Sequence, residues 1–333
     1  MTLEELKEKV ESISINDIKL YFISREIKPG VPRSYKASDK YLFKVYQIDC
    51  NQEIRNSLHF GTCRQFEKEI KNKYDIVDYD ILSDETEHLF SYSIEGKAFS
   101  FSDVVTNQLQ KICPRVTSIS HLLSDKKELW AYCVEFASDD DNSIYTFRKI
   151  LPSKIGIAEK KKKYFRTIFD TESQQLSLLK EETINLDEQI DCIFYVDTFY
   201  VLQKNNFEQI TCLHEEIKQR AKVIADEMIA CGNFVGGDNL KEMIENKPGI
   251  HKKLIKVGKI GGYKEITPQK IRSMKKICNK YGDNLPVLGD QFTLNSEKEL
   301  DIILKAFGDY YKIGEISGKP YGTFAGKELM KAQ

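Results

Sequence analysis

The sequence has no apolar run of the roughly 20 residues that a membrane-spanning helix needs. None of its eight cysteines lies in a CxxC pair, which argues against both a zinc site and a disulfide framework. No glycine-rich phosphate loop follows a predicted strand, so Rossmann and P-loop nucleotide-binding folds are excluded. Residues 1–11 predict a charged amphipathic helix rather than the apolar segment of a signal peptide. We therefore expect a cytoplasmic protein whose cysteines are reduced.

The charges nearly cancel over the whole chain but are unevenly distributed. The 333 residues include 50 Lys and Arg against 51 Asp and Glu, a net charge of -1. Between Lys247 and Lys280, eleven basic residues accompany one acid, Glu265, so this segment carries +10 and the remainder of the chain -11. A second basic cluster is Lys160–Lys163, and an acidic cluster is Asp139–Asp141. Local fields of this kind, rather than net charge, steer polyanions to a protein.

The hydrophobic pattern predicts an α+β protein in two parts, with a boundary near residue 120. Residues 1–120 form a mixed amino-terminal region, in which 101–112 is one of the expected helices. Residues 121–333 form a second domain. Its short strand-like runs at 128–203, separated by polar turns, predict a central antiparallel β-sheet. Residues 204–333 then predict a helical and basic carboxyl-terminal part.

Two amphipathic helices are expected in the basic segment, at 249–260 and 268–281. The second begins with Thr267 as N-cap and Pro268 at the first helical position. Each helix places apolar residues on one face and basic residues away from it. The residues that we expect to contact nucleic acid, including the separate Lys160–Lys163 run, are Lys252, Lys253, Lys256, Lys259, Arg272, Lys275, Lys276, Lys280, Lys160, Lys161, Lys162 and Lys163.

These helices lack the interleaved Glu and Lys of ordinary surface helices, in which unlike pairs stabilise and like pairs repel. A phosphate backbone would relieve the repulsion and release counterions. Lysine outnumbers arginine, which favours phosphate contacts over base contacts and therefore binding without sequence preference. The alternatives are a solvated face, pairing with acidic residues, or an anionic membrane surface. The last is disfavoured because the helices have no Trp or Phe face to insert.

The sequence contains no recognisable catalytic constellation. Its five histidines lack metal-ligand spacing, and no GxSxG elbow is present. One alternative function is a metal-dependent nuclease, whose clustered carboxylates would come from Asp187, Asp191 or the loop Asp139–Asp141. Another is a scaffold whose lysine face docks an acidic protein. We expect a protein that binds DNA without chemistry of its own, with neither a cofactor nor a metal.

Three blocks of the second half carry a resemblance to a known family. The first is a hairpin from Asp191 followed by a short helix with the sequence NFE, ending at Ile210. The second is HKKLIKVGKIGGY at His251–Tyr263, and the third is Ile303–Lys327, which contains ISGKPY. These blocks resemble a bacterial family of domains of unknown function whose best-known member is KwaB of the Kiwa anti-phage defence system. Ser317 stands where the family usually has Thr, and residues 1–120 match none of its patterns.

This resemblance implies a cytoplasmic DNA-binding effector that works with KwaA, a membrane protein that senses infection. It implies that such a KwaA-like partner recruits the chain to the inner face of the membrane. We expect the chain to form a homo-oligomer, a dimer. The implied DNA binding agrees with the charge distribution, which is evidence of a different kind.

Overall fold

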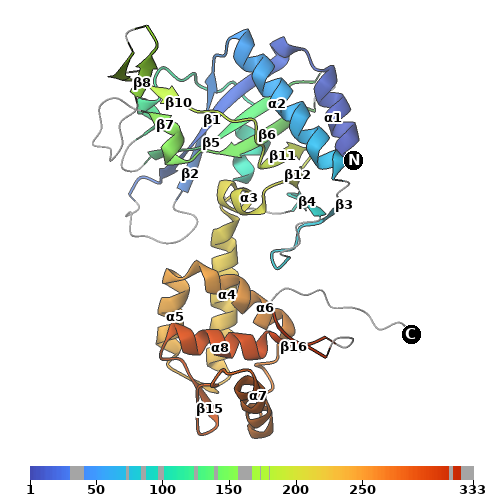
Figure 1. Ribbon diagram of the computed structural model, residues 1–333, viewed down its shortest axis with the longest axis vertical. Helices are drawn as coiled ribbons and strands as arrows, with labels where there is room; N and C mark the ends of the chain where they lie inside the picture. The colour runs from blue at the N-terminus through green and yellow to red at the C-terminus, as the bar shows by residue number, and fades with distance from the viewer. Residues whose placement is uncertain are drawn as a thin grey trace. The chain divides into compact units, whose positions relative to one another are not determined.

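The computed structural model describes residues 1–30, 41–72, 75–83, 88–96, 101–123, 127–138, 142–156, 167–172, 174–179, 181–314 and 318–323. The chain divides into two compact units (Figure 1). The N-terminal unit is Met1–Tyr79 with Thr86–Leu213, and the C-terminal unit is Asp80–Glu85 with His214–Gln333. Helices and a large mixed sheet are both present, which confirms the predicted α+β class. No helix in the described ranges combines the length and apolar character that crossing a membrane requires.

The N-terminal unit is built on an eight-stranded sheet with the order β2-β1-β5-β6-β11-β12-β4-β3. All neighbouring strands are antiparallel except β3 and β4, which pair in parallel. The strands are β1 (Ile18–Ile27), β2 (Tyr41–Ile48), β3 (Asp75–Asp78), β4 (His88–Ser93), β5 (Lys127–Phe136), β6 (Ile144–Lys149), β11 (Cys192–Tyr195) and β12 (Thr198–Val201).

The central four strands, β5, β6, β11 and β12, come from the part of the chain where the sequence predicts an antiparallel sheet. Strands from residues 1–120 lie on both sides of them, β1 and β2 on one and β4 and β3 on the other. The sheet therefore continues across residue 120, because β1 pairs with β5 along nearly its whole length. The first 120 residues complete the sheet rather than packing beside it.

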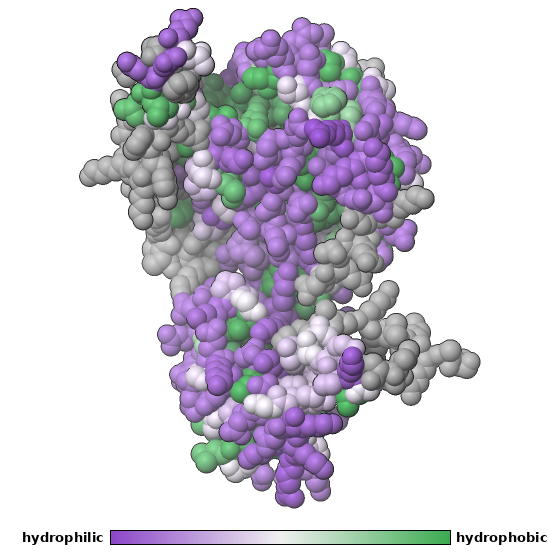
Figure 2. Space-filling view, viewed as in Figure 1, coloured by the Kyte–Doolittle hydropathy of each residue, from purple (hydrophilic) through white to green (hydrophobic). Residues whose placement is uncertain are grey.

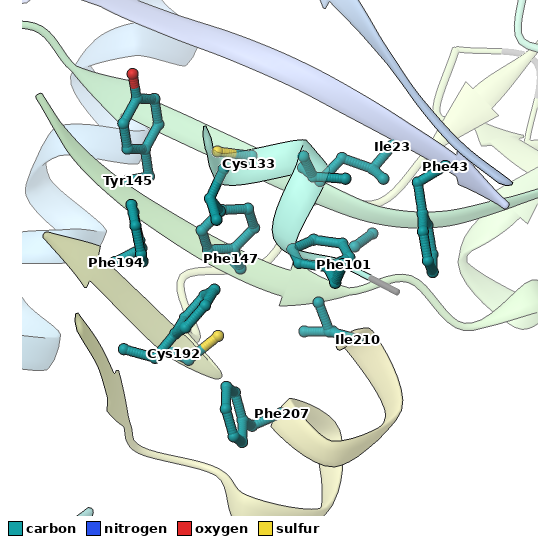
Figure 3. Packing of buried hydrophobic residues seen from close by; sticks show 14 of the residues in the cluster. Ile23, Phe43, Phe101, Cys133, Tyr145, Phe147, Cys192, Phe194, Phe207 and Ile210 are labelled. Carbon is teal, nitrogen blue, oxygen red and sulfur yellow. The ribbon is translucent and has the colours of Figure 1, made fainter. Parts of the chain in front are cut away.

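Both faces of the sheet are covered. On one face lie α1 (Leu3–Ser12) and α2 (Gln52–Lys71), whose Leu6 and Phe66 are buried with Ile193 of the sheet. On the other face, aromatic rings from β6, β12 and α3 (Lys204–Ile210) pack together (Figure 3). Alternate side chains of each strand supply the two cores.

The helix expected at 101–112 is a single π-helical turn, Val104–Gln108. This segment is held by hydrogen bonds to β2, the edge strand of the sheet. The Gln108 amide donates to the carbonyl of Phe43 at 2.9 Å and accepts from the N–H of Val45 at 3.1 Å. These bonds to β2 hold the segment against the strand, and Phe101 is buried beneath it (Figure 3).

Short strands and 3-10 turns complete the N-terminal unit. Strands β7 (Ile155–Gly156) and β10 (Thr183–Ile184) form one pair, and β8 (Thr167–Asp170) and β9 (Gln175–Leu178) form a hairpin. Three 3-10 turns of this unit are Ile15–Asp17, Ser120–Leu122 and Pro152–Lys154.

The C-terminal unit has its own core, formed by helices around buried residues such as Leu254, Tyr263 and Phe292. Its helices are α4 (Leu213–Ala230), α5 (Gly237–Asn246), α6 (His251–Ile260), α7 (Pro268–Lys280) and α8 (Glu297–Phe307), with a 3-10 turn at Pro248–Ile250. Its strands are β13 (Phe234–Val235), β14 (Val287–Leu288), β15 (Gln291–Thr293), β16 (Tyr311–Ile313) and β17 (Pro320–Gly322). The helical character predicted for this part of the chain is confirmed.

Candidate nucleic-acid interface

Helix α7 presents the basic face predicted for it. The Thr267 hydroxyl accepts from the N–H of Lys270 at 3.2 Å, and Pro268 occupies the first turn, so the helix begins as the sequence predicts. Its buried side chains are Ile271, Met274 and Cys278. Four of its five exposed basic residues, here named the α7 stripe, are Arg272, Lys275, Lys276 and Lys280; Arg272 lies three and four residues before the two adjacent lysines, and Lys280 four after Lys276. The fifth, Lys270, donates to the backbone carbonyls of Gly262 and Glu265. The end of the C-terminal unit that carries α7 is strongly hydrophilic (Figures 1 and 2).

The α7 stripe has no acidic partner within the described part of the chain. Helix α7 contains no Asp or Glu, and none of the four side chains forms an ion pair with a described residue. The nearest following acid, Asp283, is already bonded to the Tyr311 hydroxyl at 2.7 Å and to Lys305 at 3.5 Å. Like charges at this spacing destabilise a helix, so a bound polyanion would stabilise α7.

Helix α6 packs more deeply than α7. Gly258 allows α6 to approach α4, since any side chain there would collide with Ile224. His251 is buried, with its Nε2 2.7 Å from the carbonyl oxygen of Ile244. A carbonyl only accepts, so this nitrogen donates, and burial lowers the pKa of His251 and favours the neutral ring. The predicted contact residues of α6 are therefore less accessible: Lys259 is exposed, whereas half-buried positions are Lys252, Lys253 and Lys256.

Acidic residues of neighbouring helices neutralise part of the basic segment. Lys253 Nζ lies 2.6 Å from Oδ1 of Asp301 on α8. Burial favours the protonated acid, but hydrogen bonds from Lys253 and Lys305 prevail and lower the pKa of Asp301. Two further pairs are Lys247 with Glu297 at 2.8 Å and Lys264 with Glu227 at 3.3 Å. Part of the +10 charge is thus neutralised within the chain and is not available to an external ligand. Of the predicted contact residues that the structure describes, the exposed ones are the α7 stripe and Lys259.

Two clusters singled out in the sequence, Lys160–Lys163 and Asp139–Asp141, lie outside the described residues. The structure therefore places eight of the twelve predicted contact residues, all on α6 and α7. The exposed members of α7 form one continuous stripe, whereas α6 adds a single exposed lysine.

The carboxylates considered for a nuclease are joined by an arginine. Asp191 is fully buried, and it accepts from Arg148 Nη1 at 2.6 Å, the N–H of Lys149 at 2.7 Å and Asn206 Nδ2 at 2.8 Å. Arg148 also donates to both oxygens of Asp187, at 2.9 and 3.1 Å. Burial raises the pKa of Asp191, against the lowering effect of these hydrogen bonds. The guanidinium thus stands between the two acids, where a nuclease would hold its cation.

No group of three or more His, Cys, Asp or Glu side chains among the described residues is arranged to hold a metal ion. The Arg148 network has a structural role that sequence reasoning missed. The available signal was an arginine that directly follows the apolar residues of β6, a position at which burial requires an acid to balance its charge.

The same network explains part of the first resemblance block. Asp191 directly precedes the first strand of the hairpin, and Asn206 lies in the short helix that follows the hairpin. Their hydrogen bond therefore joins the start of the block to its helix. Phe207 is fully buried, and Glu208 accepts from the Tyr79 hydroxyl at 2.7 Å. The NFE sequence therefore stabilises the sheet of the N-terminal unit.

Comparison with known proteins identifies the family. A family model described as Kiwa protein KwaB-like matches residues 126–317, more than half of the chain. The chain belongs to the Kiwa KwaB-like family. The suspected resemblance is thereby confirmed, and the family places the chain among the components of Kiwa anti-phage defence. The match begins at β5 and extends through α8, so it includes both α6 and α7. No curated protein and no solved structure matches the chain.

Proposed function

We propose that the chain serves Kiwa anti-phage defence by binding DNA, with the α7 stripe as its principal contact surface. The observation that carries the proposal is a continuous row of four exposed cations without an acidic partner among the described residues. Each cation that neutralises a phosphate releases condensed counterions, which makes binding favourable and dependent on salt. The family membership supports a role in defence against invading DNA.

The chemistry of the α7 stripe favours binding without sequence preference. Three of its four members are lysines, which act as point charges toward phosphates, whereas the planar fork of arginine is better suited to bidentate contact with a guanine edge. Phosphate contacts fix position and orientation but carry no base information. Such a protein would occupy phage DNA wherever it enters and impede its functions without cleaving it.

The test replaces all four residues of the α7 stripe with Gln and measures binding to two unrelated duplexes by fluorescence anisotropy. We expect affinity for both duplexes to fall by about tenfold or more, since four phosphate contacts are removed. A matched control changes four exposed lysines without ion pairs among the described residues, Lys68, Lys71, Lys111 and Lys298, to Gln. Equal losses in the two variants, or a loss for one duplex alone, would contradict the proposal.

We further propose that the chain acts in the cytoplasm as a dimer and reaches the inner face of the membrane through a KwaA-like partner. Support comes from the family and from the charge of -11 that the chain carries outside Lys247–Lys280. An acidic surface complements a basic cytoplasmic loop, and such complementarity sets encounter rate and partner choice.

Co-expression tests this second proposal. With the membrane partner present, the chain should sediment with membranes at low salt and be released at high salt, because the contact is electrostatic. Without the partner it should remain in the supernatant and elute at the mass of a dimer. A monomer that stays in the supernatant beside the partner at every ionic strength would refute both statements.

A further inference from the structure

A cavity of about 500 Å³ in the N-terminal unit lies between α2 and the sheet. Its floor is formed by β5 and β6, one wall by α2, and the other by residues 184–190. Gly61 of α2 packs directly against Glu188, since a Cβ at Gly61 would lie 3.0 Å from Glu188 Cβ. The cavity is therefore bounded by closely packed elements of one unit, and its volume falls within the range of small-molecule sites.

Two hydroxyls of largely buried residues line this cavity without a protein partner among the described residues. Thr62 on α2 is 4% exposed and Thr146 on β6 is 3% exposed, yet neither side chain forms a hydrogen bond with any described residue. A helical hydroxyl commonly bonds the carbonyl four residues earlier, as Ser57 does with Glu53 at 2.9 Å. Thr62 does not. Both hydroxyls reach the water-accessible space of the cavity, where a ligand would form hydrogen bonds with them in place of water.

The remaining lining defines the chemistry of that ligand. Apolar side chains such as Ile54, Leu58 and Ile190 suit a flat hydrophobic body. Among the charged lining residues, Arg148 is bonded to Asp187 and Asp191. Glu188 pairs with Arg64, which lies outside the lining, at 3.2 Å. The acid Glu53 remains without a counter-charge among the described residues and makes the field negative. A negative field disfavours phosphates and other anions.

We propose that this cavity binds a small, neutral or cationic, flat amphipathic molecule, whose hydrogen-bonding groups meet the hydroxyls of Thr62 and Thr146. The field would exclude nucleic acid from it, so the site is separate from the α7 stripe and does not depend on DNA binding. A ligand there would bridge α2, the sheet and residues 184–190 and thereby stabilise the N-terminal unit.

The test uses three probes with one ring system and different charges: indole, tryptamine and indole-3-acetate. Binding to the full chain is measured by calorimetry or by saturation-transfer NMR. We expect tryptamine to bind more tightly than indole, and indole-3-acetate to bind at least about tenfold more weakly than tryptamine. Failure of both indole and tryptamine to bind at millimolar concentration would overturn the proposal, as would equal binding of all three probes.

Isosteric variants connect binding to the two hydroxyls. Replacing Thr62 and Thr146 with Val should weaken tryptamine binding by about fivefold to tenfold and leave the unfolding midpoint unchanged or raised, because neither hydroxyl has a partner to lose. The control is Thr211→Val, whose buried hydroxyl donates to the Phe207 carbonyl at 2.6 Å. That variant should lower the midpoint without changing binding. Unaltered tryptamine binding by the double variant would overturn the assignment.

Discussion

The molecule holds two clusters of charged residues that look equally site-like in sequence and differ completely in their surroundings. In the N-terminal unit, Asp187 and Asp191 are both bonded to Arg148, and Asp191 has no exposed surface. In the C-terminal unit, the α7 stripe is exposed and without an ion-pair partner among the described residues. The difference teaches that a cluster becomes a candidate site when its charges lack partners within the chain, whatever their number.

The largest expected effect on stability comes from the cluster in which Arg148 is bonded to both Asp187 and Asp191. Arg148→Met should lower the free energy of unfolding by about 3–5 kcal/mol, because Asp191 would remain buried without its counter-charge. Urea denaturation measures the change. The control is Arg64→Met, which breaks an ion pair with Glu188 that is more than half exposed and should cost less than about 1 kcal/mol. Similar losses of stability in the two variants would contradict the distinction between the buried Arg148 cluster and an exposed ion pair.

A smaller effect on stability is expected at Glu245 in the C-terminal unit, which pairs with two lysines. Burial opposes ionisation of Glu245, but hydrogen bonds from Lys218 and Lys222 prevail and lower its pKa from 4.5 to about 2. A depressed acid pKa stabilises the fold above the unfolded value, and this stabilisation is lost as pH falls from about 4.5 toward 2.

Glu245→Gln should therefore lower stability by about 1–2 kcal/mol at neutral pH, a figure reduced for partial exposure, and should weaken the acid dependence. Urea denaturation between pH 2 and 7 provides the measurement. Glu242→Gln, on the same helix and exposed, is the control and should leave the acid dependence intact. If the Glu245→Gln variant kept the full acid dependence of stability, the ion pairs of Glu245 with Lys218 and Lys222 would not be the source of that dependence.

The smallest effect separates the two basic helices. Lys253→Met removes the half-buried pair with Asp301 and should cost about 0.5–1 kcal/mol of stability. Because Lys253 is committed to α8, DNA affinity should change less than in Lys276→Gln, which removes one exposed cation of the α7 stripe. Denaturation and anisotropy on the same preparations give both quantities. A larger affinity loss in the Lys253 variant would place the interface on α6.

Much of the fold could be predicted because its signals are local. Helix α8 follows from periodicity over Glu297–Phe307, and α7 from Thr267 and Pro268 at its start. Strand β5 lies in the region where the sequence predicts an antiparallel sheet, but its pairing with β1 could not be predicted, since the paired residues are more than 100 positions apart in the sequence. Pairing at that distance leaves no periodic signal in the sequence.

The candidate site shows the same division. Which residues are basic, and which helix face they occupy, could be predicted for α7 because a helical wheel needs only local spacing. The ion pair between Lys253 and Asp301 depends on how α8 packs against α6, and the spacing of residues along the sequence carries no information about that packing. The shared position of Thr62 and Thr146 at one cavity could not be foreseen either, because one residue comes from a helix and the other from a strand far along the chain.

The central claim is that the α7 stripe supplies the phosphate contacts, and the salt dependence of DNA binding tests it most directly. The slope of log K against log salt concentration should fall in magnitude by about 0.9 for each contact removed, and so by roughly three to four in the variant with all four residues changed to Gln. The control with Lys68, Lys71, Lys111 and Lys298 changed to Gln should keep the wild-type slope. An unchanged slope in a folded α7 variant, or an equal fall in the control, would contradict the account.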